Sequence, residues 1–97
     1  MQNVVKMEGD AVGKLFRVIQ PVYGFLPNGN YIKFRRGDLL LLFEIIISYD
    51  NQCIEADFQL RFLTQQGYVA SMEIKANSYH DACMILIGFM QREDCTL

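Results

Sequence analysis

Apolar and polar positions alternate between Tyr31 and Arg35. A period of two is typical of a strand with one face on a core and the other in solvent. Gly37 then allows a turn with positive φ, and an apolar run that contains a single acid follows over residues 39–47. This run predicts a second strand that is covered on both faces or bends sharply midway. The strand–turn–strand pattern is typical of a small β-barrel.

The strand pattern recurs in the flanking segments. Residues 14–19 predict a first strand, which ends before Pro21 because proline has no N–H to donate to a sheet. The following residues 22–30 predict a looped-out segment closed at Asn28 and Gly29, a dipeptide typical of tight hairpin turns. Two later segments are also predicted strands: residues 53–63 and 68–74.

The C-terminal part of the chain allows two interpretations. Ser78, followed by an acid three residues later, is typical of a helix N-cap and would begin a helix over residues 79–91 packed on a β-sheet. The residues after 81 are continuously apolar, however, and Gly88 would lie inside such a helix. We therefore expect a short helical turn near residues 77–81 and a closing strand over residues 82–89.

The length of 97 residues allows one domain, and 52% hydrophobic residues are ample for its core. A charged fraction of 21% excludes the disordered class. We expect a flexible N-terminal arm over residues 1–12 and a single small β-barrel domain over residues 13–97.

Two motifs resemble those of SH3 domains. Residues 31–40, Tyr-Ile-Lys-Phe-Arg-Arg-Gly-Asp-Leu-Leu, resemble the diverging turn of that family. Residues 67–71, Gly-Tyr-Val-Ala-Ser, resemble its later Gly-Tyr-Ile/Val-Pro-Ser signature, which leads into a one-turn helix and the closing strand. The resemblance covers residues 14–89 and implies a mainly β fold, a five-stranded SH3-like barrel.

Two departures limit what this resemblance implies about ligands. The chain has no Trp, and Ala70 stands where the signature has Pro. Binding of Pro-rich segments requires a groove lined by aromatic side chains. The resemblance therefore implies the fold and not the ligand.

The charge is distributed unevenly, although the net charge is only −2. Residues 1–37 carry six Lys and Arg residues against two acids, whereas residues 38–97 carry three against nine. Strands from the two halves interleave and neutralise each other in one interpretation. In the other, Lys33, Arg35 and Arg36 form a basic edge that meets an acidic partner or phosphate.

The polar residues do not assemble into recognisable catalytic machinery. His80 and Cys83 could form a metal pair or a thiol with its base, but they lack further ligands at a recognisable spacing. Glu55 and Asp57 share one strand face and, with Asp50, could bind a cation, although a solvated strand face also explains them. We expect no enzymatic activity, no metal and no cofactor.

Two features predict a cytoplasmic protein. The three cysteines, Cys53, Cys83 and Cys95, are an odd number without a Cys-x-x-Cys motif, which is typical of a reducing compartment. The N-terminus lacks the apolar segment of a signal peptide, and no apolar run is long enough to span a membrane.

These features favour a small protein-binding domain. The candidate partner-binding residues combine aromatic rings with cations: Tyr23, Phe25, Tyr31, Lys33, Arg35 and Arg36. Small binders of this kind are typical of phage proteins that inhibit a host protein by steric occlusion. One alternative is a nucleic-acid-binding barrel, ranked lower because its cations are few. The other is a homo-oligomeric structural subunit in which a neighbour covers residues 39–47.

Overall fold

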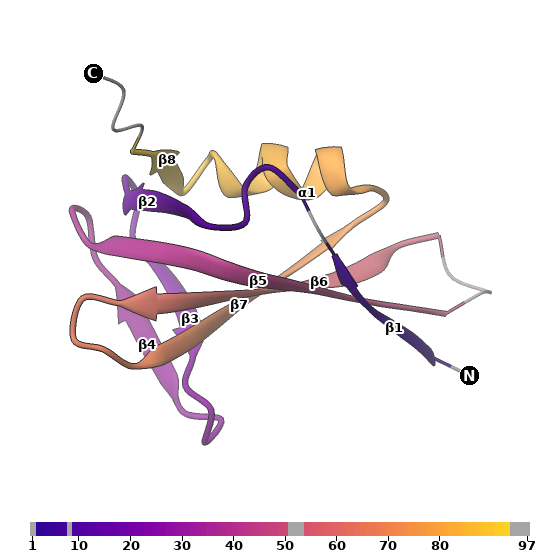
Figure 1. The fold of residues 1–97 in the computed structure, drawn as a ribbon, viewed down its shortest axis with the longest axis horizontal. Helices are drawn as coiled ribbons and strands as arrows, with labels where there is room; N and C mark the ends of the chain where they lie inside the picture. Colours follow the sequence, from indigo (N-terminus) through magenta and orange to yellow (C-terminus); the bar gives the residue numbers. More distant parts are fainter. Residues whose placement is uncertain (1, 8, 51–53, 94–97) are drawn as a thin grey trace.

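The computed structural model describes residues 2–7, 9–50 and 54–93 (Figure 1). This part of the chain is mainly β, with eight strands and one short helix. All the paired strands are antiparallel. In chain order the elements are β1 Gln2–Met7, β2 Lys14–Val18, β3 Val22–Phe25, β4 Tyr31–Phe34, β5 Leu39–Asp50, β6 Ala56–Thr64, β7 Val69–Ala76, α1 Tyr79–Leu86 and β8 Met90–Arg92.

Strand β5 has 12 residues and organises the sheet. Strand β6 lies along one edge of β5. The other edge is shared, because β2 pairs with residues 39–42 of β5 and β1 pairs with residues 45–50. Between β1 and β2 the chain leaves this edge and buries Ala11, which is 7% exposed. We expected a flexible arm over residues 1–12; in the structure, the edge of β5 supplies hydrogen-bond partners that make β1 a strand.

The sheet curls into a half-barrel (Figure 1). Its strand order is β4-β3-β7-β6-β5-β2-β8. The N–H of Val18 donates to the Asp38 carbonyl at 2.9 Å, and the N–H of Gly37 donates to the Val18 carbonyl at 2.8 Å. These bonds extend the pairing of β2 with β5 into the turn between β4 and β5.

The core lies between the curled sheet and α1, which covers one face of the sheet (Figure 1). Alternate residues of β6 and β7 face this core, as their period of two predicts. They are Phe58, Leu60, Phe62, Ala70, Met72 and Ile74. The helix contributes Ala82 and Leu86.

Strand β5 contains an irregularity typical of a β-bulge. Its register with β6 shifts between Leu42 and Glu44, and both Leu42 and Ile45 are buried. The residue inside the bulge, Phe43, is partly exposed and lies under the guanidinium of Arg61, 5.5 Å from ring centroid to carbon. The register shift changes which positions of the run face the core, from Leu40 and Leu42 before it to Ile45 after it, and this explains why the run does not simply alternate.

The closing strand predicted for residues 82–89 is wrong, because the chain forms α1 there and returns to the sheet only at β8. The Ser78 hydroxyl accepts a hydrogen bond from the Asp81 N–H at 3.1 Å and caps the helix. The alternative helix over residues 79–91 has the correct start but is too long. The continuous apolar run favoured a buried strand in the prediction. In the structure the same run forms a helix that exposes some of its apolar side chains, such as Met84.

The structure is mainly β and curled, as predicted, but its described residues form eight strands where the resemblance to SH3 domains implied five. The additional strands include β1 in the expected arm, β3 in the segment predicted as a loop, and β8 after the helix. Strands β3 and β8 contain only four and three residues. Segments this short become strands only when a neighbouring strand supplies hydrogen-bond partners, which the sequence does not show.

Candidate functional site

Four of the six candidate binding residues lie together on the hairpin of β3 and β4. Tyr23 is the cross-strand partner of Lys33, and Phe25 is the partner of Tyr31. Cross-strand partners point to the same side of a sheet, and so do residues two apart in one strand. Tyr23, Phe25, Tyr31 and Lys33 therefore form one surface, which we call the hairpin face. Arg35 follows β4 directly in the next turn.

The turn of this hairpin is closed by local hydrogen bonds. The Gly29 N–H donates to the Leu26 carbonyl at 2.9 Å, and the Leu26 N–H donates to the Asn30 carbonyl at 2.8 Å. The Asn28 side-chain oxygen accepts from the Asn30 N–H at 2.9 Å. Gly29 has a φ of 88°, which glycine adopts without strain. The tight turn that the Asn-Gly dipeptide predicts is therefore present.

The opposite side of the hairpin packs against the sheet. The Phe34 ring is buried and meets the Phe62 ring edge to face, with 6.3 Å between centroids and 72° between planes. Gly24 lies close to β7, where an added Cβ atom would stand 2.6 Å from the Ser71 carbonyl oxygen. This packing fixes the hairpin on the sheet and directs the hairpin face outward.

The hairpin face exposes large aromatic rings. Tyr23 is 61% exposed and Tyr31 is 72% exposed. The Tyr31 ring lies 4.9 Å from the ring of Phe25, measured between centroids. A tyrosine offers a large contact area and loses little side-chain entropy on binding, which makes it frequent in binding surfaces.

Positive charge without ion pairs collects beside these rings. Lys33, Arg35 and Arg36 are exposed and form no ion pair with any residue that the structure describes. The nearby Asp38 carboxylate accepts a hydrogen bond from the backbone N–H of Arg35 at 2.8 Å and so stabilises the turn. Of the remaining cations, only Lys14 also lacks an ion pair within the described ranges; the paired ones are Lys6, Arg17, Arg61, Lys75 and Arg92.

The hairpin face continues onto the outer face of the sheet. Phe25 is the cross-strand partner of Ser71 in β7, so both side chains point to the same side. A groove of about 390 Å³ opens beside them. Its walls come from β3, the hairpin turn, β5, β6 and β7: Phe25, Leu26, Pro27, Gly29, Ile46, Gln59, Arg61, Val69, Ser71 and Glu73. Sequence reasoning missed this groove because only the strand register brings these segments together.

Near this groove, Glu44 lies between two cations. Its carboxylate oxygens lie 2.8 Å from the Arg61 guanidinium and 3.1 Å from the Lys6 ammonium. The Arg61 hydrogen bond, and then that of Lys6, hold the pKa of Glu44 below its usual range. The positive charge of Arg61 is thus neutralised by Glu44. Lys33, Arg35 and Arg36 differ in this respect, since none of them has an ion pair among the described residues.

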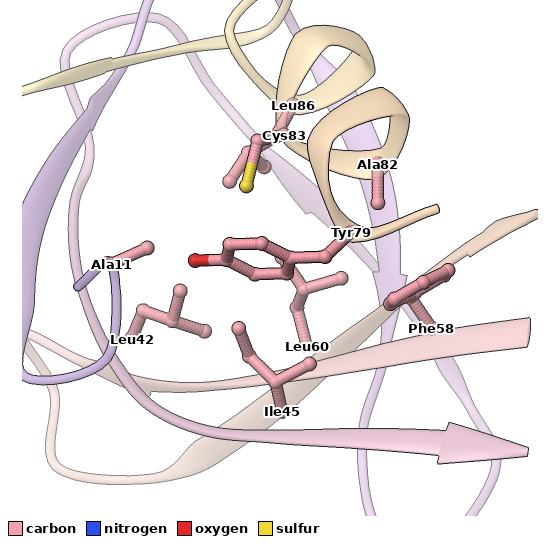
Figure 2. Close-up of a pocket in the computed structure, with 9 residues that line it drawn as sticks. All are labelled: Ala11, Leu42, Ile45, Phe58, Leu60, Tyr79, Ala82, Cys83 and Leu86. Atoms are coloured by element: carbon pink, nitrogen blue, oxygen red, sulfur yellow. The ribbon is translucent and has the colours of Figure 1, made fainter. Parts of the chain in front are cut away.

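The other candidate groups do not form a site. Cys83 and the ring of Tyr79 point into a cavity of about 10 Å³ under α1 (Figure 2), which has room for about one water molecule. Burial, and then the neighbouring Cys83 thiol, raise the pKa of Tyr79 to about 12. His80 is exposed on the same helix. Among the described residues, no three His, Cys, Asp or Glu side chains come together as a metal site.

The acids considered as a cation site are dispersed as well. Glu55 is exposed, whereas the Asp57 carboxylate lies 4.0 Å from the Lys75 ammonium on the neighbouring strand. The predictions that involve Cys53 and Cys95 concern residues outside the described ranges.

Comparisons of the chain with family models, with curated proteins and with solved structures found no match. Within residues 2–7, 9–50 and 54–93, no helix is both long and apolar enough to cross a membrane.

Proposed function

We propose that the chain is a non-enzymatic domain that binds another protein through the hairpin face together with Arg35 and Arg36. The observation that supports this most concerns three cations that form no ion pair with any described residue: Lys33 on the hairpin, and Arg35 and Arg36 directly after it. The same hairpin exposes Tyr23 and Tyr31. Tyr and Arg are enriched among the residues that dominate binding energy in interfaces. Cations without partners in their own chain favour a partner surface that carries acidic groups.

The mode of action that fits this domain is steric occlusion. No chemistry is needed, because a folded domain seated on an acidic surface excludes other molecules from that surface. Attraction between the hairpin cations and the partner raises the association rate, and salt weakens this effect by screening the charges.

A second candidate function is the binding of single-stranded nucleic acid. The exposed rings of Tyr23 and Tyr31 share a face with Lys33, and bases stack on such rings while cations contact phosphate. Three cations allow only a few phosphate contacts, and the chain is acidic overall. These points rank nucleic acid below protein.

Self-association is the third candidate. In this alternative a neighbouring copy covers residues 39–47, but Leu40 and Leu42 of this run are already buried within the chain itself. The most exposed of the described aliphatic residues lie outside this run and are spread over the chain: Val4, Ile54, Met84 and Ile87. They do not form one apolar face in a single element, which ranks self-association below the other two candidates.

The proposal is tested by capture of partners from a bacterial lysate on the tagged protein, with and without nuclease. The decisive variant reverses two charges, Arg35→Glu with Arg36→Glu. A matched control, Lys14→Glu with Lys75→Glu, changes the net charge equally at positions outside the hairpin. We expect the parent chain to retain one protein after nuclease treatment. The Arg35→Glu, Arg36→Glu variant should lose this protein, and the control variant should keep it.

Other results would contradict the proposal. Equal loss of the partner from both double variants would mean that net charge, and not the position of the cations, determines binding. Full retention by both would mean that Arg35 and Arg36 do not contribute to binding. Loss of every partner on nuclease treatment would favour nucleic acid, and recovery of the chain alone would favour self-association.

A further inference from the structure

The backbone of β4 has an edge that is not used by β3. Bonded and non-bonded residue pairs alternate along an antiparallel hairpin. The Leu26 N–H donates to the Asn30 carbonyl, so these two residues are a bonded pair. It follows that the next pair, which contains Tyr31, is non-bonded, and so is the pair that contains Lys33. The N–H and C=O groups of Tyr31 and Lys33 therefore point away from β3.

The other strand of the hairpin supports this alternation. Phe25 is the partner of Tyr31, so its backbone groups also point away from the hairpin. Phe25 is the residue through which β3 pairs with Ser71 of β7. The outward N–H and C=O groups of Phe25 in β3 thus face β7. Those of Tyr31 and Lys33 in β4 point to the edge of β4 that lies opposite β3.

This other edge of β4 is open over two residues. In the part of the chain that the structure describes, β4 stands at the end of the strand order and pairs with β3 alone. The edge stops at Arg35, whose N–H donates to the Asp38 carboxylate and whose carbonyl accepts from the Asp38 N–H at 3.0 Å. Two N–H and two C=O groups, those of Tyr31 and Lys33, remain for another strand.

A groove runs beside this open edge. Its volume is about 320 Å³, and it separates β4 from the turn between β6 and β7. The β4 side is lined by Ile32, Lys33, Phe34 and Arg35, and the far side includes Thr64, Gln65, Gln66 and Tyr68. The groove therefore provides space where an added strand would lie.

The side chains at this edge select for an acidic strand. Lys33 and Arg35 form no ion pair within residues 2–7, 9–50 and 54–93, and a residue opposite Lys33 would lie beside its ammonium. Pairing with β4 of a second copy would instead gather the same cations from both copies in one patch, where they repel. An acidic segment of a different chain removes this repulsion.

We propose that the open edge of β4 binds an extended acidic segment of the protein partner by antiparallel strand addition. This inference rests on the proposed function and specifies how the hairpin recognises its partner. From N- to C-terminus, the segment places an acid beside Arg35, an acid opposite Lys33 and an apolar residue opposite Tyr31, with one residue between successive positions. Backbone hydrogen bonds supply affinity and the alternating side chains supply specificity, as in other cases of strand addition.

A synthetic peptide tests this recognition directly: acetyl-Thr-Glu-Thr-Glu-Thr-Val-Thr-amide. Its control is the same peptide with N-methyl groups on the second Glu and on Val, which removes the two N–H donors and keeps every charge. Binding is followed by amide chemical shifts of the full chain labelled with ¹⁵N. We expect the amide shifts of Tyr31 and Lys33 to change and saturate as the unmodified peptide is added. The N-methylated peptide should bind more weakly by a factor of about ten or more.

Two variants of the protein test the same edge from the other side. Tyr31→Pro removes an outward N–H that β3 does not use, and Tyr31→Ala removes the ring but keeps that N–H. The amide spectrum of each variant establishes that the fold is intact. We expect the Pro variant to bind the peptide several-fold more weakly than the Ala variant.

The outcomes separate this inference from the proposed function. Equal binding of the two peptides would overturn strand addition, while the Arg35→Glu, Arg36→Glu result could still support a charge-based protein surface. Absence of peptide binding at millimolar concentration would also overturn strand addition. The proposed function is tested separately by partner capture, an experiment that does not use the peptide.

Discussion

Gly9 lies against the phenol end of Tyr79, where a Cβ atom on Gly9 would stand 2.6 Å from the hydroxyl oxygen. This contact joins the segment between β1 and β2 to the helix α1. The Tyr79 hydroxyl is buried there and makes no hydrogen bond of good geometry within the described residues. A glycine at this position therefore leaves room for an aromatic side chain of the helix to lie over the sheet.

Replacement of Gly9 by Ala should destabilise the protein by about 1–3 kcal/mol, because the added methyl group overlaps the Tyr79 ring. Tyr79→Phe in the same background should recover part of the loss, since it removes the nearest atom. Urea unfolding of the two single variants and the double variant measures this coupling, and Lys14→Ala serves as an exposed control. A Gly9→Ala protein as stable as the parent would show that the segment moves aside freely.

Alkaline pH should destabilise the protein partly through Tyr79. Its pKa is raised from 10.0 to about 12, so the folded state favours the neutral hydroxyl. The stability that this preference contributes is complete below about pH 10 and is lost as the pH rises toward about 12. Unfolding free energies measured across this range should fall less steeply for Tyr79→Phe than for the parent. Identical slopes would contradict the buried position of this hydroxyl.

Acidic pH should act through Glu44. Because Arg61 and then Lys6 lower its pKa from 4.5, the stability that the carboxylate contributes is present above that value and is lost as the pH falls below it. Glu44→Gln should remove this part of the acid dependence. Glu73→Gln is the matched control, since Glu73 is exposed on β7 and has no ion pair in the described part of the chain. An equal response of both variants to acid would refute the role of Glu44.

Gly24→Ala should loosen the hairpin from the sheet. The added Cβ would meet the Ser71 carbonyl oxygen at 2.6 Å and the Phe34 ring at 2.7 Å, and the backbone oxygen cannot move without disturbing β7. We expect a loss of about 1–3 kcal/mol in the free energy of unfolding. The neighbouring exposed change Tyr23→Ala should alter stability by no more than about 0.5 kcal/mol. Similar losses in the two variants would mean that the close approach of Gly24 is not required.

Much of the candidate site could be predicted because its causes are local. The Asn28-Gly29 turn and the alternation that begins at Tyr31 predicted a hairpin turn and a half-buried strand, and both are present. Four of the six residues selected from the sequence share one face: Tyr23, Phe25, Tyr31 and Lys33. Their common orientation depends on the register of β3 with β4, which the sequence pattern alone could not establish, since residues 22–30 were predicted to be a loop.

The sequence by itself determined the features that depend on neighbouring residues: the buried faces of β6 and β7, the hairpin turn and the helix N-cap at Ser78. The tertiary structure alone decided that residues 2–7 form β1, that the apolar C-terminal run becomes α1 and then β8, and that one edge of β4 stays open. The physical reason is that a strand at an edge needs hydrogen-bond partners from another segment. A continuous apolar run does not reveal which of its residues a distant segment will cover.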